Sequence, residues 1–130
     1  MADTFKFELV TPERMLLSEE AVEVVVPGTE GAFTVLPGHA PVLSTIRPGV
    51  IEAALADSRK VRLYVKGGFA EVDAAHLTVL AQHAVEVQAM SAALVAEELA
   101  AAENELATAA DDAVRLAAHA AIEELRALKV

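Results

Sequence analysis

The N-terminal two-thirds of the chain carries the hydrophobic pattern of β-strands. Residues 4–9 have phenylalanine or leucine at every second position, and residues 61–66 have valine or leucine in the same rhythm. Alternation with a period of two predicts strands that turn one face towards a core. Residues 21–26 and 77–81 are short runs rich in β-branched side chains, and they predict two further strands.

Turn-forming pairs separate these runs. Pro27–Gly28, Pro37–Gly38 and Pro48–Gly49 recur at intervals of ten and eleven residues, and Gly67–Gly68 follows. Proline presets φ for the first turn position, and glycine accepts a positive φ at the next. The gaps are too short for the helical crossovers that parallel strands need. The pattern therefore predicts an N-terminal β-sandwich, or flattened barrel.

From about Ser91 the pattern changes to that of helices. Fifteen of the last 40 residues are alanine, glycine and proline are absent there, and apolar residues recur every three to four positions. We predict two helices of roughly 15 to 18 residues, each about 24 Å long, folded into an antiparallel hairpin. Thr108 is the expected N-cap of the second helix, with Asp111 at the reciprocal position and in reach of Arg115. The predicted domains are residues 1–86, the β-sandwich, and 87–130, the hairpin.

The expected core is mostly aliphatic. Apolar residues make up 55% of the chain but aromatic residues only 4%. The few large core pieces are expected to be Phe5, Phe7, Phe33, Phe69 and Tyr64. The alanine-rich hairpin offers only a thin packing face, which leaves little stabilisation after the cost of ordering it. We therefore expect the hairpin to be marginal alone and able to move relative to the body.

The charge and composition of the chain restrict the kinds of partner that it can bind. Its formal net charge is −10, which disfavours nucleic acid and direct insertion into anionic lipid. It has no cysteine, so disulfides and thiol catalysis are excluded. The first residues show no apolar signal segment, and no apolar run is long enough to span a membrane.

The sequence predicts no catalytic, cofactor-binding or metal-binding residue. The four histidines show no paired ligand spacing, and there is no phosphate-binding loop motif and no GxSxG serine. The acid pairs Glu19–Glu20 and Asp111–Asp112 are adjacent residues, whose side chains point apart. The first helix carries Glu97, Glu98, Glu103 and Glu105 and no base. These acids form either a solvated face or a surface that meets, or avoids, another charged protein.

The most distinctive segment is EGAFTVLPGHAP at 30–41. Pro37 and Pro41 bracket Gly38, His39 and Ala40, which predicts a stiff loop with His39 at its tip. One interpretation is a conformationally demanding corner. The other is a preorganised contact loop, since a rigid loop loses little entropy on docking.

Five ordered motifs give the chain a family resemblance. FELVTPER at 7–14, the 30–41 segment, RPG at 47–49, GGFAEV at 67–72 and LTVLA at 77–81 resemble the epsilon subunit of bacterial F-type ATP synthases, the homologue of mitochondrial delta. The resemblance spans the β part in order, and a helical hairpin follows in that family too. It implies a non-catalytic central-stalk subunit that couples rotation of the c-ring, through the gamma subunit, to the catalytic head.

The resemblance also implies where contacts and location lie. Glu30 and Gly31, with the loop of Pro37, Gly38, His39, Ala40 and Pro41, match the family's contacts with gamma and the c-ring. The hairpin of such subunits can also reach the beta or alpha subunits. A peripheral position on the cytoplasmic face of a bacterial inner membrane is expected, as part of the proton-transporting complex.

The chain departs from the family pattern in three respects, and the last two bear on function. Thr34 replaces a glycine of the common motif, a small change within a strand. Members that bind ATP carry an aspartate and an arginine at the start of the hairpin, whereas residues 87–92 read VQAMSA. The hairpin also has three bases against eight acids. We therefore expect no ATP binding, and weak or absent inhibition of ATP hydrolysis by the hairpin.

A rival interpretation keeps the fold but changes the role. The chain would then be a stand-alone β-sandwich binding module whose hairpin dimerises. Co-purification with a gamma-like coiled coil favours the first hypothesis, and a stable homodimer in gel filtration favours the rival.

Overall fold

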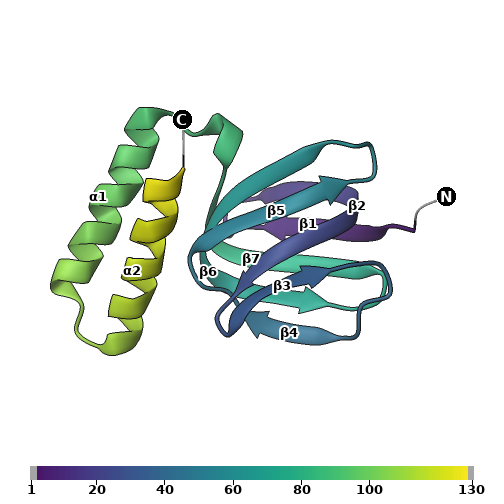
Figure 1. The fold of residues 1–130 in the computed structure, drawn as a ribbon, viewed down its shortest axis with the longest axis horizontal. Helices are drawn as coiled ribbons and strands as arrows, with labels where there is room; N and C mark the ends of the chain where they lie inside the picture. The colour runs from purple at the N-terminus through teal and green to yellow at the C-terminus, as the bar shows by residue number, and fades with distance from the viewer. Residues whose placement is uncertain (1–2, 129–130) are drawn as a thin grey trace.

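A computed structural model describes residues 3–128, which form a β-body and a helical hairpin beside it (Figure 1). The elements, in chain order, are β1 Phe5–Val10, β2 Met15–Gly28, β3 Gly31–Val35, β4 Val42–Thr45, β5 Gly49–Leu55, β6 Lys60–Val72, β7 His76–Glu86, a 3-10 turn Val87–Ala89, α1 Ala92–Thr108 and α2 Asp112–Ala127. The predicted sandwich followed by an antiparallel hairpin is confirmed. Both helices, of 17 and 16 residues, have the predicted length.

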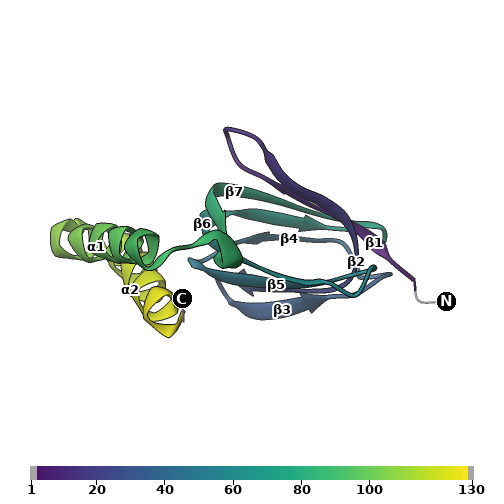
Figure 2. The same cartoon turned by 90° about the horizontal axis from the view of Figure 1, so that it is seen from above.

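The seven strands form one sheet that closes on itself. Its order is β1-β7-β6-β5-β2-β3, β4 pairs with β6, and β1 pairs with β2 to close the ring. All these pairings are antiparallel except β1 with β7. Seen from above, the ring is flattened into two layers (Figure 2). The core between the layers comes from every second residue of each strand, for example Phe5, Phe7 and Leu9, as the alternation predicts.

Two expected turns lie inside long strands. Pro27–Gly28 ends β2, and the chain reverses at the next two residues. Gly67–Gly68 lies within β6, where φ is +67° and +119°. There β6 passes from its pairing with β5 to its pairing with β4. The glycines thus bend a strand that continues, because β7 pairs with β6 on both sides of them.

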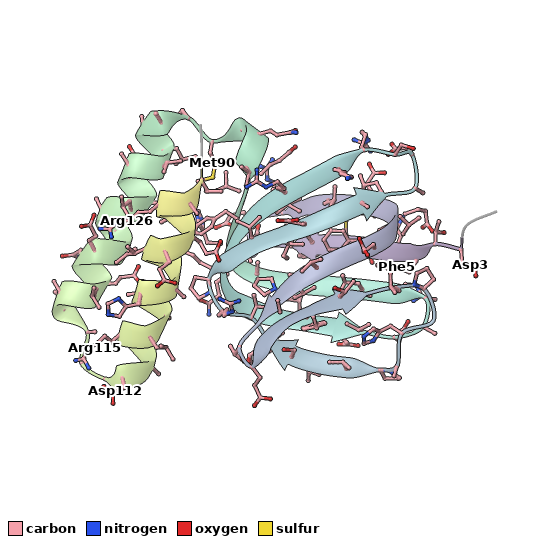
Figure 3. All side chains as sticks on the ribbon, in the orientation of Figure 1. Asp3, Phe5, Met90, Asp112, Arg115 and Arg126 are labelled. Atoms are coloured by element: carbon pink, nitrogen blue, oxygen red, sulfur yellow. The ribbon has the colours of Figure 1, made fainter. Side chains whose placement is uncertain are left out.

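The hairpin begins and turns at capped helix ends. Ser91 Oγ accepts the backbone N–H of Leu94 at 3.1 Å and so caps α1. The cap of α2 is Asp111, which accepts from Val114 N at 2.9 Å, and not Thr108. Thr108 still belongs to α1, and its hydroxyl donates to Asn104 O. The ion pair at this turn joins Arg115 to Asp112, at 2.7 Å, instead of Asp111 (Figure 3).

The hairpin packs against the β-body through a second apolar cluster, separate from the core inside the sandwich. Its buried members are Tyr64, Val87, Met90, Ala102, Ala121, Ile122, Leu125 and Leu128. Met90 lies where the hairpin joins the body (Figure 3). On α2, Ala118, Ile122 and Leu125 are buried, whereas Val114, which follows the same helical spacing, is 42% exposed. Of α2, it is therefore the C-terminal half that packs into this cluster.

Candidate functional site

A groove runs between β3 and β4, at the open side of the sandwich. β3 pairs only with β2, and β4 only with β6, so one edge of each strand faces this groove. The groove narrows where Thr29 N donates to Thr45 O at 3.0 Å and their hydroxyls lie 2.6 Å apart. It encloses about 770 Å³. Its lining is mixed, with Phe33, Val42 and Leu43 among threonine, serine and backbone groups.

The predicted contact residues lie at both ends of β3. Glu30 and Gly31 form the β2–β3 turn and the start of β3, whereas Pro37, Gly38, His39, Ala40 and Pro41 follow its end. The length of β3 separates the two groups by about 17 Å. Glu30, Gly31 and His39 nevertheless all line the same groove, and the other four residues are not among its lining. The two segments thus flank one elongated surface.

The loop of residues 36–41 is held by backbone hydrogen bonds. His39 N donates to Leu36 O at 3.1 Å, and Gly38 N donates to Ala74 O at 2.9 Å, which ties the loop to the β6–β7 turn. That turn is ordered in its own right. Asp73 Oδ1 accepts the N–H groups of Ala75 and His76, both at 2.8 Å, and these bonds hold the pKa of Asp73 below its usual value. His39 is therefore presented from a braced loop.

Beside the groove, an apolar row crosses the outer face of the sheet. The register aligns Phe69 of β6 with Leu80 of β7, Val10 of β1 and Met15 of β2. Phe69, Leu80 and Met15 are each at least 50% exposed, and Val10 is half-buried. We call these four residues the apolar row. Leu43 of β4, 71% exposed, lies beside it, and Leu43 and Phe69 also line the groove.

The apolar row is a candidate binding surface that the sequence did not predict. Phe69 was expected in the core, yet it is 51% exposed. The signal was present in the strand pattern. In residues 77–80, Leu77 and Val79 face the core while Leu80, on the opposite face, is also apolar. A strand that is apolar on both faces is covered on both faces, or exposes a surface that another molecule can cover.

The hairpin interface combines apolar packing with two acid–base contacts. Glu98 Oε2 lies 2.6 Å from His83 Nε2, and Glu105 Oε1 lies 2.9 Å from Lys66 Nζ. Lys66 and His83 are directly opposite on β6 and β7. Glu98 and Glu105 are seven residues apart, so both lie on one face of α1. Two of the four glutamates of α1 therefore belong to the contact with the body and not to a solvated face.

Tyr64 belongs to this interface, and its hydroxyl has no hydrogen-bond partner in the described part of the chain. The residue is fully buried, and no group within residues 3–128 forms a hydrogen bond with its Oη. Burial raises the pKa of Tyr64 well above its usual value, and the carboxylates of Glu98, Glu105 and Glu124 raise it further.

Residues 3–128 contain neither a metal-binding cluster nor a membrane-spanning helix. No group of three or more His, Asp or Glu side chains in residues 3–128 is arranged to hold a metal ion. Likewise, no helix in that range is both long and apolar enough to cross a lipid bilayer. The described surface carries a groove, a braced loop and an apolar row.

Comparison with known proteins decides the family. Residues 4–87 match the family model described as the β-sandwich domain of the ATP synthase delta/epsilon chain. The chain belongs to the ATP synthase delta/epsilon family. It is 42% identical over 129 residues to the ATP synthase epsilon chain of Parvibaculum lavamentivorans, covering 99% of this chain and 98% of the relative. It is 48% identical over 113 residues to that of Rhodospirillum rubrum, covering 87% and 84%.

Solved structures agree on the fold of this delta/epsilon chain. A chain of the Euglena gracilis mitochondrial ATP synthase, from its OSCP/F1/c-ring assembly, superposes with a TM-score of 0.72 at 23% identity, covering 95% of this chain and 78% of that one. A chain of the Tetrahymena thermophila mitochondrial ATP synthase, from its central stalk and c-ring, gives 0.64 at 14% identity, covering 95% of both. The hairpin, which the family model leaves out, is thus part of the shared fold.

Proposed function

We propose that this chain is a non-catalytic subunit of the central stalk of a rotary proton-translocating ATP synthase. In this role it couples rotation of the c-ring to the catalytic head through the gamma subunit, from the cytoplasmic face of a bacterial inner membrane. Its membership of the delta/epsilon family supports the proposal, as do fold neighbours solved within F1/c-ring and central-stalk assemblies. We assign the binding of gamma and the c-ring to the β-sandwich domain, residues 1–86. The helical hairpin, residues 87–130, is a separate domain.

The apolar row is the observation that carries the binding role. Four apolar side chains in register across neighbouring strands form a flat surface that water solvates poorly. The row also joins the groove through Phe69, so it is continuous with the surface that Glu30, Gly31 and His39 line. We assign the row to the gamma subunit and the ends of the groove to gamma and the c-ring loops.

The exposed area of Phe69 gives the expected loss of affinity for gamma when this side chain is removed. It exposes 51% of its surface. A phenylalanine has roughly 200 Å² to bury, so a partner that covers it removes about 100 Å² from water. At about 25 cal/mol per Å² this is about 2.5 kcal/mol, or roughly a fiftyfold change in affinity.

The test is binding of the full chain to purified gamma subunit, measured by titration. Phe69→Ala should weaken binding roughly fiftyfold. Leu116→Ala is the matched control, because Leu116 is 73% exposed but lies on α2, away from the row. Unchanged affinity of the Phe69 variant, or equal weakening by both variants, would contradict the assignment.

The groove is tested separately by crosslinking. The chain has no cysteine, so a single cysteine placed at His39 or at Glu30 gives a unique attachment point. In the reconstituted complex, both positions should crosslink to gamma or to a c-ring subunit. A cysteine at Asp57, in the β5–β6 turn and outside the lining of the groove, should not. Crosslinks from Asp57 alone would remove the groove from the interface.

The rival binding module makes a different prediction in solution. Gel filtration of the isolated chain should give a monomer if the row awaits gamma, and a stable dimer if the hairpin dimerises. A dimer that resists Phe69→Ala but is lost on removal of the hairpin would favour the rival.

The hairpin is expected to inhibit ATP hydrolysis weakly or not at all. Its eight acids outnumber its three bases, and an acidic partner surface would repel it. The measurement compares hydrolysis by the assembled catalytic head carrying the full chain or a truncation near Val87. A several-fold rise on truncation would disprove this expectation.

A further inference from the structure

The docked hairpin buries a tyrosine hydroxyl without a partner. Tyr64 projects from β6 into the cluster that joins body and hairpin, with zero exposed surface. The carboxylates that act on its pKa belong to Glu98 and Glu105 of α1 and Glu124 of α2, yet no group within residues 3–128 forms a hydrogen bond with Oη. A buried phenol normally finds an acceptor. This one does not.

The ring and the hydroxyl of Tyr64 act in opposite directions on docking. When the hairpin packs on the body, the ring leaves water and contacts apolar side chains from both helices, which favours the docked state. The hydroxyl loses its hydration and gains nothing, which opposes that state. When the hairpin leaves, the hydroxyl is hydrated again. The cost of the hydroxyl therefore falls on the docked state alone.

Release of the hairpin can occur without opening the body. The core of the sandwich and the cluster around Tyr64 share no buried residue. The connection is a single 3-10 turn and a short extended link to Ser91. Among residues 3–128, the polar side-chain contacts that join hairpin to body are the ion pair Lys66–Glu105 and the hydrogen-bonded pair Glu98–His83, both with a partly exposed partner. Such pairs add little to docking.

We propose that Tyr64 sets the balance between docked and released hairpin, its ring holding the helices on the body and its hydroxyl loosening them. The inference concerns the isolated chain and does not depend on gamma or the c-ring. It predicts that two substitutions of the same residue change the stability of docking in opposite directions. Tyr64→Phe keeps the ring and removes the cost, so docking strengthens. Tyr64→Ala removes the ring, so docking weakens.

Hydrogen exchange of the full chain tests both signs. Amides of α1 and α2 in Tyr64→Phe should exchange about tenfold more slowly than in the parent chain, while strands of the body core stay unchanged. Tyr64→Ala should accelerate the same amides, as should Ile122→Ala, which truncates a buried side chain of α2 in the same cluster. Equal or faster helix exchange in Tyr64→Phe overturns the proposal. So does slowing that extends equally through the strands, because the effect would then be on the whole fold.

Thiol labelling provides a second measurement. Ala121 is 1% exposed in the interface, and the chain has no native cysteine. The labelling rate of Ala121→Cys therefore reports release of the hairpin. Adding Tyr64→Phe should slow labelling about tenfold. Ala53→Cys, at a site 3% exposed in the core of the sandwich, is the control and should label more slowly than Ala121→Cys. Equal rates at the two sites would show that the hairpin never leaves independently, and would overturn the proposal.

Discussion

Gly68 is the residue whose replacement tests the bend of β6 most directly. A Cβ atom there would lie 2.0 Å from Leu80 O and 2.9 Å from Ala81 Cα, both in the backbone of β7. Both atoms belong to the backbone and cannot move aside as the flexible end of a side chain could. Gly68→Ala must therefore push β6 and β7 apart. The backbone φ of +119° adds strain of its own.

Gly31 separates these two costs. Its φ is +131°, close to that of Gly68, but a Cβ at Gly31 would meet nothing within 4 Å. Both alanine variants pay the conformational strain, about 1–3 kcal/mol. Only Gly68→Ala also disturbs the ladder at the pairs Gly68–Ala81 and Phe69–Leu80. At about 1 kcal/mol for each hydrogen bond lost, it should cost about 2 kcal/mol more than the control.

Urea unfolding followed by far-UV circular dichroism measures the difference. With a slope of about 2 kcal/mol per M for a chain of this size, the midpoint of Gly68→Ala should lie about 1 M below that of Gly31→Ala. Equal midpoints would refute the reasoning. They would mean that β7 yields to the extra methyl group at little cost, and that close approach does not fix the bend that presents Phe69.

Three further predictions use single groups. The docked hairpin favours the neutral phenol of Tyr64 and so raises its pKa. Docking should therefore be unaffected at pH values below the usual tyrosine pKa of 10.0 and should weaken as the pH rises above it. Tyrosinate absorbance and helix amide exchange, followed over the same pH range, test this. Because the pKa of Asp73 is lowered in the folded chain, its carboxylate stabilises the fold above pH 3.8, the usual pKa, and this stabilisation is lost as the pH falls through the lower folded pKa. The parent chain should therefore have a higher urea midpoint than Asp73→Asn at pH 7 and lose that difference in acid. Glu98→Gln should speed exchange of the helix amides a few-fold, within about 1 kcal/mol, whereas Glu97→Gln, a change at an exposed site, should leave it unaltered.

The strands and helices could be predicted because their signals are local. Alternation of apolar side chains identified β1 and the first half of β6, and loss of glycine and proline identified the hairpin. The expected turn at Gly67–Gly68 failed for a non-local reason. Both glycines adopt the positive φ that turn chemistry favours, but pairing with β7 continues β6 beyond them, so that they bend the strand without ending it. The local sequence around Gly67 and Gly68 does not indicate that a strand distant in sequence will continue the hydrogen-bonded pairing of β6.

The candidate site shows the same division. The stiffness of the His39 loop follows from Pro37 and Pro41, which the sequence displays. The approach of Glu30 to the same groove depends on β3 and β4 pairing with different strands. The exposure of Phe69 depends on register, since a shift of one residue would turn it inwards. Composition alone assigned it to the core, because aromatic residues are scarce in this chain and are most often buried.

The acids of α1 link the structure of the hairpin to its expected behaviour in the complex. Glu98 and Glu105 face His83 and Lys66 only while the hairpin is docked. A released hairpin carries both carboxylates unpaired, together with Glu97 and Glu103, and α1 supplies no base to offset them. Release therefore makes the helix more repellent to an acidic partner surface, not less. The polar contacts that α1 makes with the body, and the charge that we expect to oppose its use as a brake, thus come from the same side chains.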